Sequence, residues 1–357
     1  MKRRDFLTST GVAAGAAIAG APFVRIGAAR AQAKPEKIVM MTWGGLWGDS
    51  MRAGVDTAFE KATGVKVVQD RSASPVERIT KLKIGLDNQN IDIVQLHDGL
   101  VPLAVTQGVF EPIDAASPRL GNLKDVYPQF VKSHWVAMIF SPLGIAYNKK
   151  LVKNPPTAFA DLWRPEFKGR IVLPEISHSI GAYIIPIGAI AEGKSPKDGE
   201  AGFEMLKKMA DLKPIWAKDT DSIMNAFRDE EAVIGLLYKS QTYTVQGWGA
   251  PVEWVSPREG AILYSSGTAI AKNSKNRALA EQYLNMTLDP ELQTIATKNF
   301  SYPGTNRKMV DLLSPDLQVR ARVSDAELAR YVELDHEFMS NERGAWTERW
   351  NRIVAGG

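Results

Sequence analysis

The sequence predicts an α/β protein with two lobes, each a wound mixed sheet with flanking helices, and three observations support this prediction. Strand-like runs alternate with helical patterns from residue 37 to residue 94, which is the order of a wound α/β unit. A second α/β set begins near residue 170. About 320 residues follow residue 33, which favours two lobes because single hydrophobic cores stop growing at about 250–300 residues.

The first set contains three short strands and two helices. Lys37–Met41 is a short apolar run typical of a buried strand, and residues 42–45 turn the chain into a helix predicted over residues 46–62. Apolar residues recur at helical spacing in that helix, and Gly64 provides a glycine C-cap. The remaining predicted elements are a strand at 65–68, a helix at 75–86 and a strand at 91–94.

The second set follows a change in composition. A strand is predicted at residues 143–148, and prolines between residues 154 and 165 indicate a linker-like region. The later elements are a strand at 170–173, helices at 180–191 and 196–210, strands at 232–238 and 260–270, helices at 276–287 and 290–297, and a polar-amphipathic helix at 325–353.

The first 33 residues have the parts of an export signal. Arg3 and Arg4 precede a Gly- and Ala-rich apolar run from Gly11 to Ala21, and Ala-x-Ala cleavage sites follow at residues 29–33. This arrangement is typical of a twin-arginine signal, and the run is shorter than the ~20 residues of a membrane span. We expect residues 1–33 to be removed and the mature protein to work in the periplasm.

Composition narrows the possible partners. The chain has no cysteine, so we expect neither a disulfide nor a lipid-modified cysteine, and the mature protein is expected to be soluble and not lipid-anchored. Five of the 44 Lys and Arg residues, and one of the 40 Asp and Glu residues, precede residue 32. The remainder is formally neutral, which argues against a nucleic-acid partner.

Five segments spread along the chain carry a resemblance to a known family. They are Ala58–Val67, Phe110–Asp114, Gly144–Lys149, Asp161–Ile171 and Ser301–Pro303. The first resembles the F-E-x-x-T-G-[IV]-x-V segment of bacterial extracytoplasmic (periplasmic) solute-binding proteins. The fourth is similar to the D-L-W-x-P-x-[FY]-x-G segment of their spermidine/putrescine-binding branch. The order and spacing of the five segments are more specific than any one of them.

The resemblance implies a type II periplasmic-binding-protein fold, in which hinge strands join two lobes that close on a solute. It implies crossings between the lobes near Pro142, Tyr264 and Met309. The lobes are then residues 34–142 with 264–310, and residues 143–263 with 311–357. The partners implied are a small solute and the membrane permease of an ABC importer. We expect a monomer that is not an enzyme.

The strand ends of the first lobe provide candidate ligand contacts, because ligands of wound sheets bind beyond the carboxyl ends of strands. The residues after the first strand are Thr42, Trp43, Gly44 and Gly45. The glycines allow close approach of the backbone, and the helix start offers free N–H groups to an anionic group; an ordinary tight turn is the alternative. His97 and Asp98 align with a ligand-contacting loop of the branch, although His97 also fits a plain loop histidine.

The resemblance adds six candidate ligand contacts: His178, Ser179, Tyr238, Tyr264, Ser266 and Tyr302. Tyr238 and Tyr264 take the places of aromatic residues that stack on the ligand, with core packing as the alternative. Ser266 stands where the polyamine binders carry an aspartate that pairs with an ammonium group. Ile176 and Ser179 are the closest matches to their other acidic residues. The predicted pocket therefore keeps its aromatic walls and loses its acidic clamps.

These residues indicate a small ammonium-bearing solute. Each aromatic face attracts an ammonium group by ~0.5–2 kcal/mol, and the helix start after Trp43 suits a carboxylate. The solute is either a polyamine or a zwitterion such as an amino acid, a betaine or 4-aminobutyrate. The alternative is an exported hydrolase or transferase with an unrecognised site, but no nucleophile stands beside a base at usable spacing.

Neither the phosphate-loop pattern nor the histidines of this chain predict a binding site. Residues 188–195 match the phosphate-loop pattern letter for letter, but the preceding segment is helical, so Gly193 is interpreted as a helix stop and Ser195 as the N-cap of the next helix. No two of the four histidines have a metal-ligand spacing. We therefore expect neither a metal nor a cofactor.

Overall fold

The computed structural model describes residues 35–354, so the predicted export signal at residues 1–33 lies outside the described part. The strands form one nine-stranded mixed sheet in the order β2-β1-β3-β9-β4-β7-β5-β6, with β8 paired to β4. They are β1 Lys37–Met41, β2 Lys66–Asp70, β3 Ile93–His97, β4 Val136–Asn148, β5 Ile171–Pro174, β6 Ile215–Ala217, β7 Ile234–Tyr238, β8 Val252–Val255 and β9 Ile262–Ile270.

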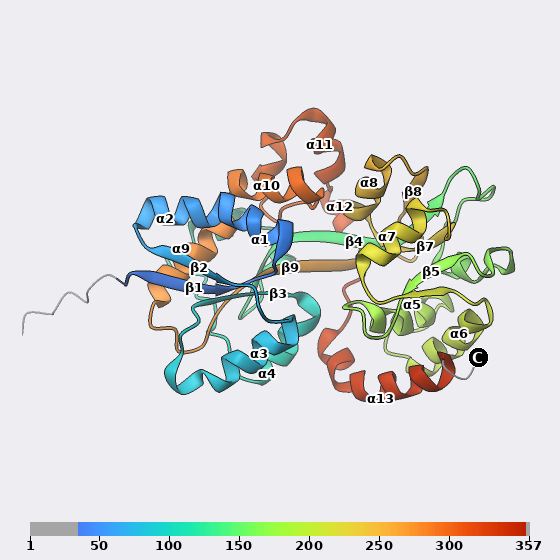
Figure 1. The fold of residues 1–357 in the computed structure, drawn as a ribbon, viewed down its shortest axis with the longest axis horizontal. Coiled ribbons are helices and arrows are strands. Elements are labelled where there is room, and N and C mark those ends of the chain that lie inside the picture. The colour runs from blue at the N-terminus through green and yellow to red at the C-terminus, as the bar shows by residue number, and fades with distance from the viewer. Residues whose placement is uncertain (1–34, 355–357) are drawn as a thin grey trace, which may run out of the picture. The chain divides into compact units, whose positions relative to one another are not determined.

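The two longest strands, β4 and β9, are shared by both halves of the sheet. They pair antiparallel from Val136 opposite Thr268 to Leu143 opposite Ile262, and they run side by side in Figure 1. Strand β3 pairs with the C-terminal part of β9, whereas β7 and β8 pair with the C-terminal part of β4. One pair of strands thus joins two α/β units, as the sequence predicts.

Helices flank both halves (Figure 1). They are α1 Gly45–Met51, α2 Thr57–Thr63, α3 Pro75–Ile84, α4 Val101–Thr106, α5 Ile184–Ala191, α6 Gly199–Asp211, α7 Thr220–Arg228, α8 Lys239–Gly247, α9 Arg277–Thr287, α10 Pro290–Phe300, α11 Pro315–Ala321, α12 Asp325–Leu328 and α13 His336–Val354. A π-helical turn, Arg52–Asp56, joins α1 to α2.

Some of these helix ends occur where a local sequence signal predicts them. Gly64 ends α2 with a φ of 65°, which favours glycine, and Gly193 follows α5 with a φ of 68°, so residues 188–195 form a helix end. The prediction for Ser195 is wrong. Helix α6 begins at Gly199, and its N-cap is Asp198, whose carboxylate accepts a hydrogen bond from the Ala201 N–H at 3.0 Å.

The prediction of one helix over residues 325–353 is also wrong. Helix α12 ends at Leu328 and α13 begins only at His336. Between them Val332 accepts a hydrogen bond from the Leu263 N–H and donates one to the Ala261 carbonyl oxygen, at 2.8 and 2.9 Å. These bonds along β9 require an extended backbone, so the helix is interrupted there.

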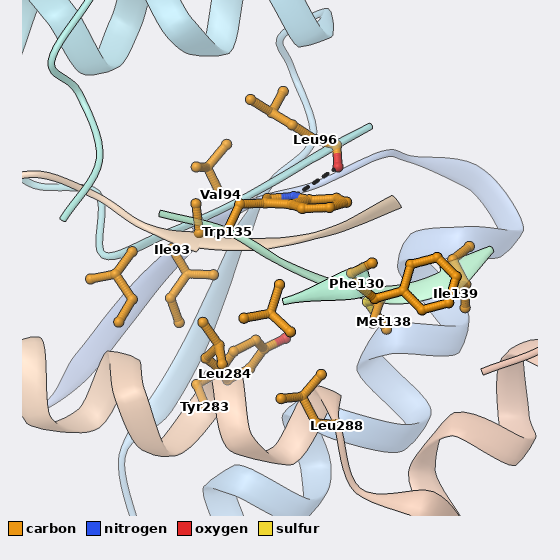
Figure 2. Packing of buried hydrophobic residues seen from close by; sticks show 14 of the residues in the cluster. Ile93, Val94, Leu96, Phe130, Trp135, Met138, Ile139, Tyr283, Leu284 and Leu288 are labelled. Atoms are coloured by element: carbon orange, nitrogen blue, oxygen red, sulfur yellow. Dashed lines mark hydrogen bonds between the residues drawn. The ribbon is translucent and has the colours of Figure 1, made fainter. Parts of the chain in front are cut away.

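Most of the buried hydrophobic residues form two large clusters that are separate from each other. The first includes Trp135, whose Nε1 donates a hydrogen bond to the Leu96 carbonyl oxygen at 3.3 Å (Figure 2). The second includes Trp346 and Trp350 of α13, as expected for a tail helix packed on a lobe. Along β4 the cluster changes between Phe140 and Leu143.

The cluster membership of residues 323–334 bears on where the chain crosses between the lobes for the third time. Val323, Leu328 and Tyr331 pack in the first cluster, and Leu334 packs in the second. We therefore propose that the chain crosses at residues 331–334 rather than near Met309, which would place residues 311–330 with the first lobe.

Among the helices of residues 35–354, none has the length and apolar character that crossing a membrane requires.

Candidate functional site

A cavity of about 470 Å³ lies beside the shared strands β4 and β9, within the usual range of about 300–1,000 Å³ for small-molecule sites. Its lining residues come from six segments of the chain. They are Trp43, Trp47, Ile139, Asp221, Gln241, Tyr264, Ser266, Phe300 and Tyr302. The lining combines residues packed against the first hydrophobic cluster with Tyr264, which packs against the second. A solute bound in this cavity would therefore contact residues that pack against each of the two hydrophobic clusters.

Aromatic rings form a continuous wall of this cavity. Trp43 meets Trp47 edge to face at 6.0 Å between ring centroids, Trp47 lies 5.6 Å from Phe300, and Phe300 lies 6.5 Å from Tyr302. The indole Nε1 of Trp47 donates to the side-chain oxygen of Gln95 at 3.0 Å. That bond fixes the ring, so the wall is formed before a ligand arrives.

Trp43 is held by a buried cation. The guanidinium carbon of Arg78 lies 4.5 Å from the Trp43 ring centroid, and its Nη1 donates to the Gln95 carbonyl oxygen at 2.7 Å. Arg78 is 1% exposed, and burial lowers its pKa to about 10, so it is charged at neutral pH. The stacking orients the indole beside the cavity.

Tyr264 lies on β9, one of the two shared strands, and it lines the cavity. Its ring centroid lies 4.7 Å from that of Tyr238 and 6.2 Å from that of His97. Burial raises the pKa of both tyrosines well above the usual value, so both hydroxyls are neutral. Tyr264 lines the cavity, whereas Tyr238 packs behind it, which fits the core-packing alternative for Tyr238.

Asp221 is the one charged side chain among the residues that line this cavity. It stands in the first turn of α7, after the N-cap Asp219, whose carboxylate accepts from the Ser222 N–H at 2.7 Å. The Asp221 carboxylate is exposed and forms no ion pair with the described residues. In place of the expected pocket without acidic clamps, we propose that Asp221 supplies an acidic contact in this cavity. We missed it because we predicted no helix at residues 220–228; Asp-Thr-Asp before an apolar spacing is the signal that could have found it.

The structure brings together four of the predicted contacts, Trp43, Tyr264, Ser266 and Tyr302. Thr42 is fully buried, and its hydroxyl donates to the Gln95 side chain at 2.6 Å, so it positions the wall. Gly44 and Gly45 are exposed at the start of α1, outside the cavity lining. Sequence reasoning missed Trp47, Ile139, Gln241 and Phe300, which lie within elements and carry no strand-end signal.

The other predicted contacts lie elsewhere. His178 is occupied locally, because its Nδ1 accepts from the Ile180 N–H at 3.1 Å and its Nε2 lies 3.2 Å from the Thr220 hydroxyl. His97 and Ser179 line a separate, smaller cavity. Asp98 accepts hydrogen bonds from the N–H and hydroxyl of Ser265 at 2.6 and 2.9 Å. Its carboxylate also lies 3.6 Å from His336 Nε2, and burial raises its pKa.

Comparison with known proteins decides the family. The model of the family described as bacterial extracellular solute-binding protein matches residues 55–327. The chain belongs to this family.

Relatives of this solute-binding protein agree with the assignment. It is 25% identical over 320 residues to the spermidine/putrescine-binding periplasmic protein of Escherichia coli strain K12, covering 87% of this chain and 90% of the relative. It is 22% identical over 339 residues to the gamma-aminobutyric acid-binding protein of Pseudomonas aeruginosa, covering 92% and 94%. The crystal structure of an ABC transporter protein from Clostridium perfringens matches with a TM-score of 0.76 and 27% identity, covering 89% of this chain and all of that one. The two-lobed type II fold is thereby confirmed.

Proposed function

We propose that this protein is the periplasmic binding component of an ABC importer and that it captures a small solute with one ammonium group between its two lobes. The observation that carries the proposal is the 470 Å³ cavity with a wall of aromatic rings and one carboxylate, Asp221. Residues on both sides of the shared strands β4 and β9 line it, which suits a ligand held by lobe closure.

The chemistry of the lining favours a monocation or a zwitterion over a polyamine. Aromatic faces attract an ammonium group by ~0.5–2 kcal/mol each, and Asp221 supplies a charge-assisted hydrogen bond. A polyamine would bring two or more ammonium groups to a single carboxylate. Gln241 and Ser266 carry N–H and O–H groups that suit the carboxylate of a zwitterion. The names of the relatives include both a polyamine binder and a gamma-aminobutyric acid binder.

The surroundings of the Ser266 hydroxyl favour a binding role over a catalytic one. The Ser266 hydroxyl donates to the Leu96 carbonyl oxygen at 3.4 Å, and none of the other lining residues is a histidine, lysine or cysteine that could activate it. We therefore propose capture and release without chemistry, a monomeric mature protein after removal of residues 1–33, and delivery to a membrane permease.

Calorimetric titration of the mature protein tests the proposal. The solutes to be titrated are 4-aminobutyrate, glycine betaine, putrescine and spermidine. Each solute is also incubated with the protein, and the mixture is then analysed for reaction products. We expect saturable binding of a zwitterion, weaker binding of the polyamines, and no product. Tight binding of the polyamines alone would reject the zwitterion proposal, and turnover of any solute would favour the exported-hydrolase alternative.

A further inference from the structure

A second, smaller cavity lies on the other side of the His97–Tyr264 ring pair. Its volume is about 190 Å³, and it is lined by Val76, His97, Gly99, Leu100, Leu103, Ser179, Ala182, Tyr183, His336, Met339, Ser340 and Arg343. These residues come from α3, from the end of β3, from the segments around residues 100 and 180, and from α13. Its lining contains Arg343, Tyr183 and two histidines and no carboxylate, whereas the one charged residue that lines the first cavity is Asp221.

One polar group in this cavity lacks a partner. Tyr183 is 3% exposed, and its hydroxyl has no hydrogen-bond partner in residues 35–354. Buried hydroxyl groups are nearly always paired, so an unpaired one that lines a cavity indicates a missing ligand or water. The Tyr183 pKa is raised well above its usual value by burial and by the nearby Asp98 carboxyl, so the hydroxyl remains a hydrogen-bond donor.

Arg343 is the one arginine or lysine among the residues that line this cavity. Arg343 lines it and forms no ion pair with any described carboxylate. Burial, together with the nearby charges of His336, Arg343, Arg78 and His178, lowers the pKa of His97 to about 3. Asp98 does not line the cavity. Its buried carboxyl, which also helps to raise the pKa of Tyr183, accepts hydrogen bonds from Ser265 and from the Gly99 N–H and lies 3.6 Å from His336 Nε2.

We propose that this cavity is a second binding site, specific for a small monocarboxylate. Arg343 provides the positive charge, and the hydroxyls of Tyr183 and Ser179 donate hydrogen bonds to the carboxylate oxygens. The apolar side of the cavity, formed by Leu100, Leu103 and Met339, accommodates a short hydrocarbon body, which an inorganic oxyanion lacks. Because β3 belongs to the first hydrophobic cluster and α13 to the second, a bound carboxylate would contact both lobes.

The test measures anion binding by the mature protein in thermal-shift titrations with sodium butyrate, sodium phosphate and sodium chloride. We expect a saturable rise in Tm with butyrate that exceeds the rise with phosphate or chloride at equal ionic strength. Arg343→Gln should weaken butyrate binding at least about tenfold, as expected for loss of a charge-assisted bond. Tyr183→Phe should weaken it several-fold without lowering the Tm of the free protein, because the hydroxyl it removes has no partner.

Arg352→Gln is the matched control, because it removes the same charge from an exposed position of the same helix, and it should bind butyrate like the wild type. Equal butyrate binding by the Arg343→Gln and wild-type proteins, or no saturable rise in either, would overturn the proposal. Tighter binding of phosphate, lost in Arg343→Gln, would replace the monocarboxylate with an inorganic oxyanion. Titrating Asp221→Asn with butyrate separates this result from a failure of the first cavity, since that variant changes a residue that lines only the first cavity and should bind butyrate like the wild type.

Discussion

Asp221 and Trp43 are the two residues on which the proposed binding of an ammonium group in the first cavity depends most. Asp221 brings the one negative charge of the lining from α7, and Trp43 brings a ring from the turn after β1. The ring is oriented by the Arg78 guanidinium at 4.5 Å, so its geometry depends on a residue outside the cavity. Affinity for an ammonium group should therefore respond to two very different substitutions, one of charge and one of ring area.

Asp221→Asn removes the charge and keeps the shape of the side chain. We expect affinity for the best ammonium-bearing solute to fall by about tenfold or more, because hydrogen bonds to charged groups contribute about 1.5–3 kcal/mol. The measurement is calorimetric titration. Asp211→Asn, on the exposed C-terminal turn of α6, is the control and should bind normally. An unchanged affinity in Asp221→Asn would show that the ammonium group lies elsewhere.

Trp43→Ala removes one ring of the aromatic wall. Loss of a cation–π contact and of buried ring surface should weaken solute binding by about tenfold, since such contacts contribute about 0.5–2 kcal/mol. Trp248→Ala is the control, because Trp248 is 46% exposed and does not line the cavity. Equal loss of affinity in both variants would contradict a specific role for Trp43.

At the scale of elements, the predictions from sequence succeeded where a local signal is sufficient. Strand β1 occupies the predicted residues, and Gly64 ends α2 as expected. They failed where tertiary contacts decide. Residues 329–335 look helical by pattern but pair with β9 through Val332. The same limit applies to the site: strand ends indicated Trp43, but Asp221 became visible only with α7 in place.

The start of α1 offers a matched pair of glycine variants. Gly45 has a φ of 57°, a left-handed conformation that costs a side-chain-bearing residue about 1–2 kcal/mol. Gly44 has a φ of −82°, and a Cβ there would meet only the Arg71 Cβ at 3.9 Å. We expect Gly45→Ala to lower the free energy of unfolding by about 1 kcal/mol and Gly44→Ala to leave it almost unchanged, as measured by urea denaturation. Equal effects would contradict the strained position of Gly45.

Strand β2 and helix α3 are joined by a carboxylate whose titration can be followed. The hydrogen bond from Ser72, helped by Lys81, lowers the pKa of Asp70 to about 2. A lowered pKa means that the ionised form stabilises the fold above the unfolded value of about 3.9, and that this stabilisation is lost as the pH falls through about 2. The difference in unfolding free energy between wild type and Asp70→Asn should therefore be larger at pH 6 than at pH 2. Ser72→Ala should show a smaller difference of the same sign, and a difference independent of pH would contradict this account.

At the scale of the whole molecule, the shared strands support the proposal that one solute acts on both lobes. Strands β4 and β9 pass from the first hydrophobic cluster to the second, and Val332, in the third crossing that we propose at residues 331–334, hydrogen-bonds to Leu263 of β9. The connections between the lobes are thus close together, so rotation requires changes at few residues. The side chains that line the first cavity are supplied by elements on both sides of those connections.

Solute binding should consequently shift the protein toward an arrangement in which both sides of the cavity contact the ligand, because a ligand favours the state it binds more tightly. We expect the radius of gyration from small-angle scattering to decrease on saturation with the best solute. The unfolding free energy should rise by about 2.7 kcal/mol at a free solute concentration of 100 times Kd. At the same solute concentration the double variant Trp43→Ala with Asp221→Asn should be only about half saturated, because two tenfold losses raise Kd about 100-fold, so its stabilisation should fall to about 0.4 kcal/mol and its change in scattering should be correspondingly smaller. Stabilisation of the wild type without any change in scattering would contradict closure and would indicate a site formed within one lobe.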